Sequence, residues 1–200
     1  MISIYNKHMN LLLKLFFLVG FMLLSPIIIL FMILIVIEDG LPALFIQNRV
    51  GKNMKIIKIF KIRTMQNATP SLGTHEVNLS NYLKVGSLIR KLKIDELPQI
   101  INYLRGDLSI VGPRPCLPNQ SHLVSLRKEK EIFHVRPGIT GLAQILGYDM
   151  SDPSLLTKVD SLYIKSKSFK LDTLIFFGTF IKSLRPYIEK KFKKQLSEGK

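Results

Sequence analysis

The chain has 200 residues, of which 29 are lysine or arginine and only 14 are aspartate or glutamate, so its formal net charge is +15 at pH 7. A charge of this size predicts an anionic partner: nucleic acid, lipid headgroups or a phosphorylated substrate. We expect no nucleic-acid partner, because 47% of the residues are hydrophobic and neither a zinc-finger spacing nor a basic-region heptad is present. The single cysteine, Cys116, excludes an internal disulfide and suits a reducing, cytosolic face.

A long apolar segment lies near the start of the chain. No charged residue occurs from Leu15 to Ile37, and a helix of this length would measure about 35 Å, enough to cross a hydrocarbon core of about 30 Å. Pro26 lacks the amide hydrogen that the carbonyl of Met22 requires, so we expect a kink, eased by a hydrogen bond from the Ser25 hydroxyl to a carbonyl one turn earlier. By itself this pattern fits a simple span with a tolerated proline. Basic residues on both sides of the segment favour instead a helix–break–helix hairpin with both ends on the cytoplasmic face.

The rest of the chain predicts a helix-rich α+β domain. Short strands are expected at Phe45 to Val50 and Met54 to Met65, a polar loop from Gln66 to Val77, and a further strand at Leu142 to Leu146. Helices are expected from Asn81 to Lys91, Glu96 to Leu104, Asn119 to Ile132, Pro153 to Tyr163 and Lys170 to Pro186. The last helix either packs on the core or lies as an amphipathic helix in the membrane interface. We therefore expect a membrane anchor at 1–40, a small catalytic domain at 41–188 and a basic tail at 189–200.

Two adjacent carboxylates, Asp95 and Glu96, stand among basic residues, where a helix is expected to begin. An aspartate at this position is commonly an N-cap that satisfies the first amides of the helix. The same amides attract phosphate oxygens, and an aspartate carboxylate can attack phosphorus to form an acyl phosphate. Adjacent acids can also hold Mg²⁺ while phosphate and water complete its octahedron. Capping and catalysis are both open at this point.

Four arginines lie in rigid or strand-like settings that suit phosphate binding. The planar guanidinium binds phosphate through two hydrogen bonds, and neighbouring prolines limit the freedom that an arginine loses when it binds. Arg114 lies between two prolines and Arg136 precedes one. Taken singly, each arginine fits a solvated or structural role better than phosphate binding, and only together with the acid pair do the four resemble a phosphate clamp. The candidates are Arg63, Arg90, Arg114 and Arg136, with Lys61 beside them.

The motifs resemble those of the bacterial sugar transferases, the monotopic phosphoglycosyl transferases that begin lipid-linked glycans. The resemblance covers nearly the whole chain and includes the Ser25-Pro26 break. Its other motifs are Gln47 to Lys52, Lys61 to Met65, Asp95 to Gln99, Gly106 to Pro115 and Arg136 to Gln144.

This resemblance implies a re-entrant membrane helix at the cytoplasmic face of the bacterial inner membrane, among its phospholipids. It also implies that Asp95 attacks the β-phosphate of a UDP-sugar and releases UMP, and that undecaprenyl phosphate then takes the phospho-sugar from Asp95. Mg²⁺ would neutralise the diphosphate, with Glu96 either near the metal or positioning the lipid phosphate. The product would begin capsule, O-antigen, lipopolysaccharide or glycoprotein synthesis. A homodimer and downstream glycosyltransferases are possible partners.

The small size resembles the compact, bacillosamine-type branch of the family, although the sequence does not identify the sugar. Two other functions compete with this one. A non-catalytic membrane module could bind anionic lipid or polyprenyl phosphate with the same arginines, but it would not need adjacent acids. A Mg²⁺-dependent phosphohydrolase would release free sugar phosphate without a lipid acceptor.

Overall fold

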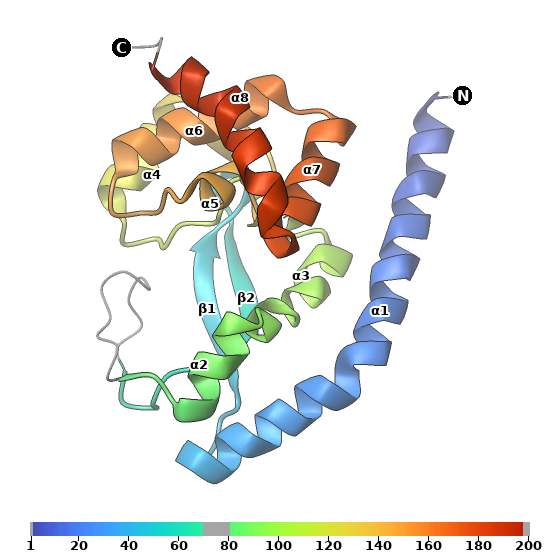
Figure 1. Ribbon diagram of the computed structural model, residues 1–200, viewed down its shortest axis with the longest axis vertical. Helices are drawn as coiled ribbons and strands as arrows, with labels where there is room; N and C mark the ends of the chain where they lie inside the picture. The colour runs from blue at the N-terminus through green and yellow to red at the C-terminus, as the bar shows by residue number, and fades with distance from the viewer. Residues whose placement is uncertain (1, 70–80, 198–200) are drawn as a thin grey trace. The chain divides into compact units, whose positions relative to one another are not determined.

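The fold is described by a computed structural model that covers residues 2–69 and 81–197 (Figure 1). Contacts within the chain divide it into two units. The first comprises Met1–Gln47 and Lys58–Gly106, and the second comprises Asn48–Ile57 and Asp107–Lys200. The hairpin of β1 (Leu44–Val50) and β2 (Ile56–Ile62) contributes residues to both units. From residue 70 onward, the loop expected between Gln66 and Val77 lies outside the described residues.

The first unit opens with α1 (Ile2–Asp39), a single helix that contains Pro26 and bends in its middle (Figure 1). The Ser25 hydroxyl donates a hydrogen bond to the carbonyl oxygen of Met22 at 2.7 Å. Met22 is the residue whose usual helical partner, the amide of residue 26, is missing because that residue is proline. The predicted bond is therefore confirmed: it satisfies a carbonyl that would otherwise be unpaired in an apolar environment.

One face of α1 packs on the rest of the first unit, while its other faces stay bare. Ile28 and Ile35 are buried in a cluster that includes Ile62 of β2 and Ile89 of α2 (Lys84–Lys91). Leu23, by contrast, is 75% exposed. Within the described part of the chain, α1 is the helix long and apolar enough to cross a membrane, from Leu11 to Asp39. Exposed apolar surface of this extent is typical of a segment that contacts lipid.

The C-terminal end of α1 is joined to the rest of the first unit by polar contacts. The Glu38 carboxylate accepts the backbone N–H groups of Lys84 at 2.7 Å and Val85 at 3.1 Å. These are the first amides of α2, which lack partners within their own helix. Asn67 donates its side-chain amide to the carbonyls of Asp39 at 2.9 Å and Leu41 at 3.1 Å. The apolar helix is thus fixed to α2, the helix that leads to the acid pair.

The second unit pairs β3 (Ser109–Val111) in parallel with β4 (Gly138–Thr140), with Ser109 opposite Gly138 and Val111 opposite Thr140. Its core includes Val159, Tyr163, Ile175, Ile188 and Phe192. The helices that supply this core and its surroundings are α4 (Ser121–Glu129), α5 (Leu142–Leu146), α6 (Pro153–Ser166), α7 (Phe169–Phe180) and α8 (Arg185–Ser197).

The strand predicted at Leu142 to Leu146 is wrong, because these residues form the short helix α5. The nearby strand is β4, which ends at Thr140. Leu142, Ala143, Ile145 and Leu146 are all buried. Burial on nearly every side removes the alternation of apolar and polar residues that distinguishes a strand from a helix, and the run is too short for its length to decide.

The single helix predicted from Lys170 to Pro186 is also wrong. α7 ends at Phe180, a 3₁₀ turn follows at Lys182–Leu184, and α8 begins at Arg185. The Arg185 guanidinium donates hydrogen bonds to the carbonyls of Gly178 at 3.0 Å and Thr179 at 3.3 Å. This arginine satisfies carbonyls that the end of α7 leaves unpaired. Pro186, in the first turn of α8, is where a proline is tolerated best.

Candidate active site

Asp95 lies in a 3₁₀ turn of the first unit, Ile94–Glu96, and is only 8% exposed. The α-helix expected to begin at Glu96 instead begins later, as α3 (Gln99–Arg105), and Pro98 occupies its N-cap position. Asp95 is therefore not the N-cap of α3, and the capping interpretation is wrong. The proline explains the shift, since it has no N–H to donate to the carbonyl of Ile94, which instead accepts the Leu97 N–H at 3.1 Å in a 3₁₀ turn.

The turn before Asp95 reverses the chain through an unusual backbone conformation. Lys93 has φ 58° and ψ 24°, the left-handed region in which glycine is the usual residue. Its backbone N–H donates to the carbonyl of Arg90 at 3.0 Å and so closes the end of α2. A Cβ on Gly86 of the same helix would collide with the backbone of Thr64, so α2 lies directly against the segment that follows β2. Together these contacts fix the position of the turn that carries Asp95.

Lys61 and Glu96 form an ion pair beside Asp95. Lys61 Nζ lies 3.2 Å from Glu96 Oε1, and the two side chains are 18% and 19% exposed. Lys61 belongs to β2, so strand and turn bring together side chains that are 35 positions apart. The structure thus gathers three of the predicted site residues: a buried carboxylate, a second carboxylate and a lysine.

The other predicted cations of the first unit, Arg90 and Arg63, lie in two different settings. Arg90, at the end of α2, places its guanidinium over the ring of Tyr82, 4.8 Å from the centroid. Arg63 is buried and donates to the carbonyl of Gly40 at 2.6 Å, and its Nη1 lies 3.1 Å from Asp39 Oδ2. Arg63 therefore binds the end of α1. No contact of either arginine tests phosphate binding, which stays a prediction.

Arg114 and Arg136 belong to the second unit. Arg114 is half-buried in the irregular Gly112-to-Pro115 segment that follows β3, as predicted for two closely spaced prolines. Arg136 is exposed and immediately precedes Pro137 and β4. A Cβ on Gly138 would collide with the backbone at Gly112, so the two proline-containing segments run in direct contact. The backbone at both arginines is held by these contacts.

Several residues that position the site were missed by sequence reasoning. Asn102, in α3, is fully buried, and both ends of its amide bond to β2. Its neighbours one turn away, Gln99 and Arg105, are also polar, so no break in an apolar face marked it, and its partners lie 42 and 44 positions earlier in the chain. Glu38, which accepts the first amides of α2, is a further example. No local signal marks it, because its partners lie far away in sequence.

The first unit thus combines a nearly buried carboxylate, an adjacent lysine–glutamate ion pair and a long, exposed apolar helix, an arrangement typical of a membrane-associated enzyme. The sequence profile of the bacterial sugar transferases matches residues 4–186. An uncharacterized sugar transferase EpsL of Bacillus subtilis is 41% identical over 161 residues, covering 80% of this chain and 79% of that protein. The chain therefore belongs to the bacterial sugar transferase family.

Two relatives have names that state a reaction. A UDP-N-acetylgalactosamine-undecaprenyl-phosphate N-acetylgalactosaminephosphotransferase of Aeromonas hydrophila is 40% identical over 167 residues, which are 78% of this chain and 39% of that protein. A UDP-glucose:undecaprenyl-phosphate glucose-1-phosphate transferase of Caulobacter vibrioides is 38% identical over 129 residues, 62% of this chain and 48% of that protein. This chain thus matches less than half the length of each. Their sugars differ, and the bacillosamine-type branch stays a prediction.

Proposed function

We propose that this protein transfers a sugar 1-phosphate from a UDP-sugar to undecaprenyl phosphate and releases UMP. The observation that carries the proposal is the nearly buried Asp95 beside the Lys61–Glu96 pair, in a chain of the bacterial sugar transferase family. The relatives named for transfer from UDP-sugars to undecaprenyl phosphate support the two substrates.

In the first step, a carboxylate oxygen of Asp95 forms a bond to the β-phosphorus of the UDP-sugar. The bond from that phosphorus to the oxygen bridging the two phosphates breaks, and UMP leaves with the bonding electrons. In the second step, an oxygen of undecaprenyl phosphate attacks the same phosphorus. The aspartyl–phosphorus bond breaks, the Asp95 carboxylate is regenerated, and a polyprenyl-diphosphate sugar is formed. No strong base is needed, because a phosphate monoester is largely ionised at neutral pH.

The basic side chains are proposed to bind the phosphates. Lys61 lies beside the acid pair through its contact with Glu96, and it can attract the diphosphate as a point charge. Arg90, Arg114 and Arg136 are proposed as further phosphate or nucleotide contacts. Arg63 is a weaker candidate, since its hydrogen bonds are directed at the end of α1.

Mg²⁺ is the proposed cofactor, and Asp95 and Glu96 are the residues that would hold it. Among the residues that the structure describes, no group of three or more histidine, cysteine or acidic side chains could hold a metal ion. A pair of carboxylates still fits Mg²⁺, which commonly binds one or two carboxylates and completes its shell with substrate phosphates and water. When bound, the ion would offset the negative charge that develops on the leaving UMP.

The membrane setting is also a proposal. We propose that α1 enters and leaves the bacterial inner membrane from the cytoplasmic side, as the bend at Pro26 suggests. Exposed aromatic and apolar side chains along α7, in the turn that follows it and at the start of α8 support an interfacial position for these helices. They are Phe169, Phe177, Phe180, Ile181 and Tyr187. A homodimer and downstream glycosyltransferases remain further predictions.

The test measures the two half-reactions separately. Without lipid acceptor, radiolabelled UMP should exchange into a UDP-sugar, because the first step is reversible and leaves a covalent intermediate. With undecaprenyl phosphate present, net UMP release should follow. Asp95→Asn should abolish both signals, whereas the matched control Glu129→Gln, which changes an exposed acid, should retain both. Lipid binding without exchange or release across a broad panel of UDP-sugars would favour the non-catalytic module.

A further inference from the structure

The backbone of the segment from Gly112 to Cys116 in the second unit is held by a series of hydrogen bonds. Its prolines have no N–H to donate, so the tethers act on the carbonyls. Four successive carbonyls, those of residues 113 to 116, accept hydrogen bonds from four separate donors. The donors are Gly138 N to Pro113 at 2.9 Å, Arg127 Nη1 to Arg114 at 2.8 Å, Arg49 Nη1 to Pro115 at 3.2 Å and Val50 N to Cys116 at 2.9 Å.

Arg127 is the most buried of these side-chain donors, with only 1% exposure. Its guanidinium forks: Nη1 bonds to the Arg114 carbonyl, while Nη2 bonds to Asp160 Oδ2 at 2.6 Å. Asp160 is 2% exposed and comes from α6, so this arginine links α4, α6 and the proline segment. The charge of Arg127 is thereby neutralised within the core.

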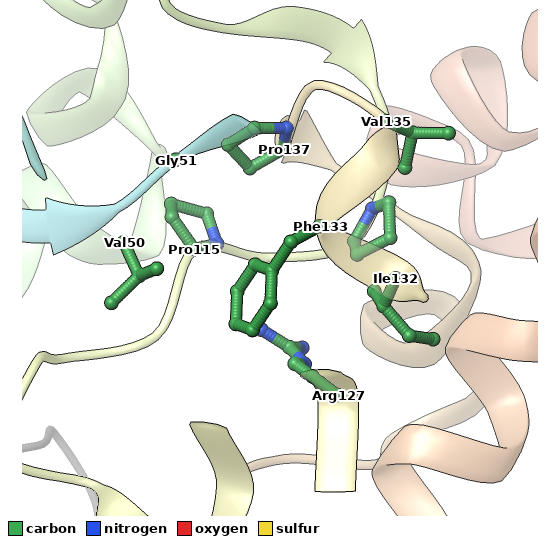
Figure 2. A pocket seen from close by; sticks show the side chains of 9 residues that line it. Val50, Gly51, Pro115, Arg127, Ile132, Phe133, Val135 and Pro137 are labelled. Carbon is green, nitrogen blue, oxygen red and sulfur yellow. The ribbon is translucent and has the colours of Figure 1, made fainter. Parts of the chain in front are cut away.

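Apart from these polar partners, Arg127 lies among apolar residues. It lines a small pocket with Phe133, Ile132 and several prolines, among them Pro115 and Pro137 (Figure 2). Hydrogen bonds in such a water-poor setting are strong, but a buried ion pair is seldom more stabilising than well-packed hydrophobic residues of the same volume. Fold stability alone therefore does not explain a buried arginine here. What an apolar residue could not supply is the hydrogen bond to the Arg114 carbonyl.

We propose that Arg127, oriented by Asp160, is a positioning residue that fixes the backbone at Arg114 and so aims the Arg114 side chain at the phosphates of the sugar donor. The inference rests on the proposed function. A guanidinium that starts from rigid backbone loses less freedom when it binds, and a small misplacement of such a group weakens transfer strongly. Arg127 itself, paired with Asp160, does not contact the donor.

Two variants separate positioning from folding. Arg127→Lys keeps a cation for Asp160, but its single nitrogen cannot reproduce the fork to both acceptors. The double variant Arg127→Met/Asp160→Leu removes both charges together, so that neither is left buried and unpaired. We expect both proteins to unfold within a few degrees of the wild type. Their kcat/KM for the UDP-sugar should nevertheless fall at least tenfold, mainly through KM.

The decisive measurement repeats Arg127→Lys and the double variant in an Arg114→Ala background. If Arg127 acts through Arg114, neither change should reduce kcat/KM further once the Arg114 side chain is absent. The matched control Glu129→Gln/Lys130→Gln, which removes an exposed ion pair from the end of the same helix, should have no effect in either background.

The positioning role would be overturned if the Arg127 variants reduced kcat/KM by the same factor with and without the Arg114 side chain, or if they did not reduce it in the wild-type background. Failure of the wild-type protein to release UMP would overturn the proposed function, and this inference with it.

Discussion

The side chain of Asn102 bonds to the backbone of Phe60 as a neighbouring strand would. Asn102 Oδ1 accepts the Phe60 N–H at 3.1 Å, while its Nδ2 donates to the carbonyl of Lys58 at 2.6 Å. One fully buried amide thus occupies a donor and an acceptor on the edge of β2. Because α3 follows the acid pair directly, this contact ties Asp95 and Glu96 to the strand that carries Lys61.

We expect Asn102→Leu to destabilise the protein by about 2–4 kcal/mol, because it leaves a buried N–H and a buried C=O without partners. Thermal or urea unfolding in detergent measures the change. The matched control Asn119→Leu alters an exposed asparagine and should shift stability by no more than about 0.5 kcal/mol. Equal stability of the two variants would contradict the strand-like role of Asn102.

The backbone at Lys93 supports a second prediction. Lys93→Gly should raise the free energy of unfolding by about 0.5–1 kcal/mol, since glycine adopts φ 58° without steric strain. Glu131 offers a matched position, because it has φ 55° and its N–H closes the end of α4 through the carbonyl of Lys128 at 3.1 Å. Glu131→Gly should be stabilising by a similar amount in the same unfolding measurement. Destabilisation at both positions would show that the side chains outweigh the backbone strain.

Local patterns predicted the features that depend on nearby residues. The helix expected to open at Pro153 is α6, which Asp152 caps by accepting the Leu155 N–H at 2.9 Å. The strand expected at Phe45 to Val50 is β1, one residue longer. The bond from Ser25 to Met22 followed from the chemistry of proline alone. In each case the residues that carry the sequence signal are close in the chain to the feature that they predict.

Features that depend on distant partners could not be predicted in this way. Asp95 matched the pattern of a helix cap, yet Pro98 delays α3, and the turn that carries Asp95 is fixed by α2 and β2 instead. The predicted strand from Leu142 is a helix because burial removed its periodicity. Arg127 pairs with Asp160, which is 33 positions later in the chain. A sequence motif identified the candidate nucleophile, but long-range hydrogen bonds determine what holds it in place.

Arg63 allows a stability role and a substrate role to be separated. Its bonds to the end of α1 predict that Arg63→Gln loses about 1–3 kcal/mol of stability, because the part-buried carbonyls of Asp39 and Gly40 lose a charged donor. The measurement pairs thermal unfolding with KM for the UDP-sugar. Arg105→Gln is the control, since Arg105 is an exposed arginine of the same unit that stacks on Phe60. A raised KM with unchanged unfolding would assign Arg63 to phosphate binding instead.

Asp172 predicts how stability depends on pH. Burial raises the pKa of this carboxyl, while the hydrogen bond from Tyr163 at 2.7 Å and the charge of Lys167 oppose the rise. The pKa of Asp172 in the folded protein therefore lies above its unfolded value of about 3.9, and between these two pKa values the native state binds more protons than the unfolded state. The stabilisation that Asp172 gives is thus present at low pH and is lost as pH rises through the folded pKa. Asp172→Asn should remove it while keeping an acceptor for Tyr163.

The measurement compares unfolding of the wild type and Asp172→Asn from pH 4 to 8. Burial also raises the pKa of Asp160, so the difference between the two proteins, rather than the wild-type curve, isolates Asp172. Relative to the variant, the wild type should lose stability as pH rises. Tyr163→Phe removes the opposing hydrogen bond and should extend this loss to higher pH. A wild type that gains stability relative to Asp172→Asn over the same range would refute the sign.

The bend in α1 predicts the membrane topology. In Ser25→Ala/Pro26→Ala, alanine restores the N–H that Met22 lacks, and the helix should straighten to a length that crosses the bilayer. A cysteine introduced as Ser3→Cys, in a Cys116→Ser background, then reports the location of the N-terminus through an impermeant maleimide. Without the double change, we expect labelling in inverted vesicles only. With the double change, Ser3→Cys should also be labelled in intact spheroplasts.

The control Ser183→Cys, at an exposed position between α7 and α8, should be labelled in inverted vesicles whether or not Ser25 and Pro26 are changed. If Ser3→Cys reacts in spheroplasts while Ser25 and Pro26 are intact, α1 is a simple span and the re-entrant anchor is wrong.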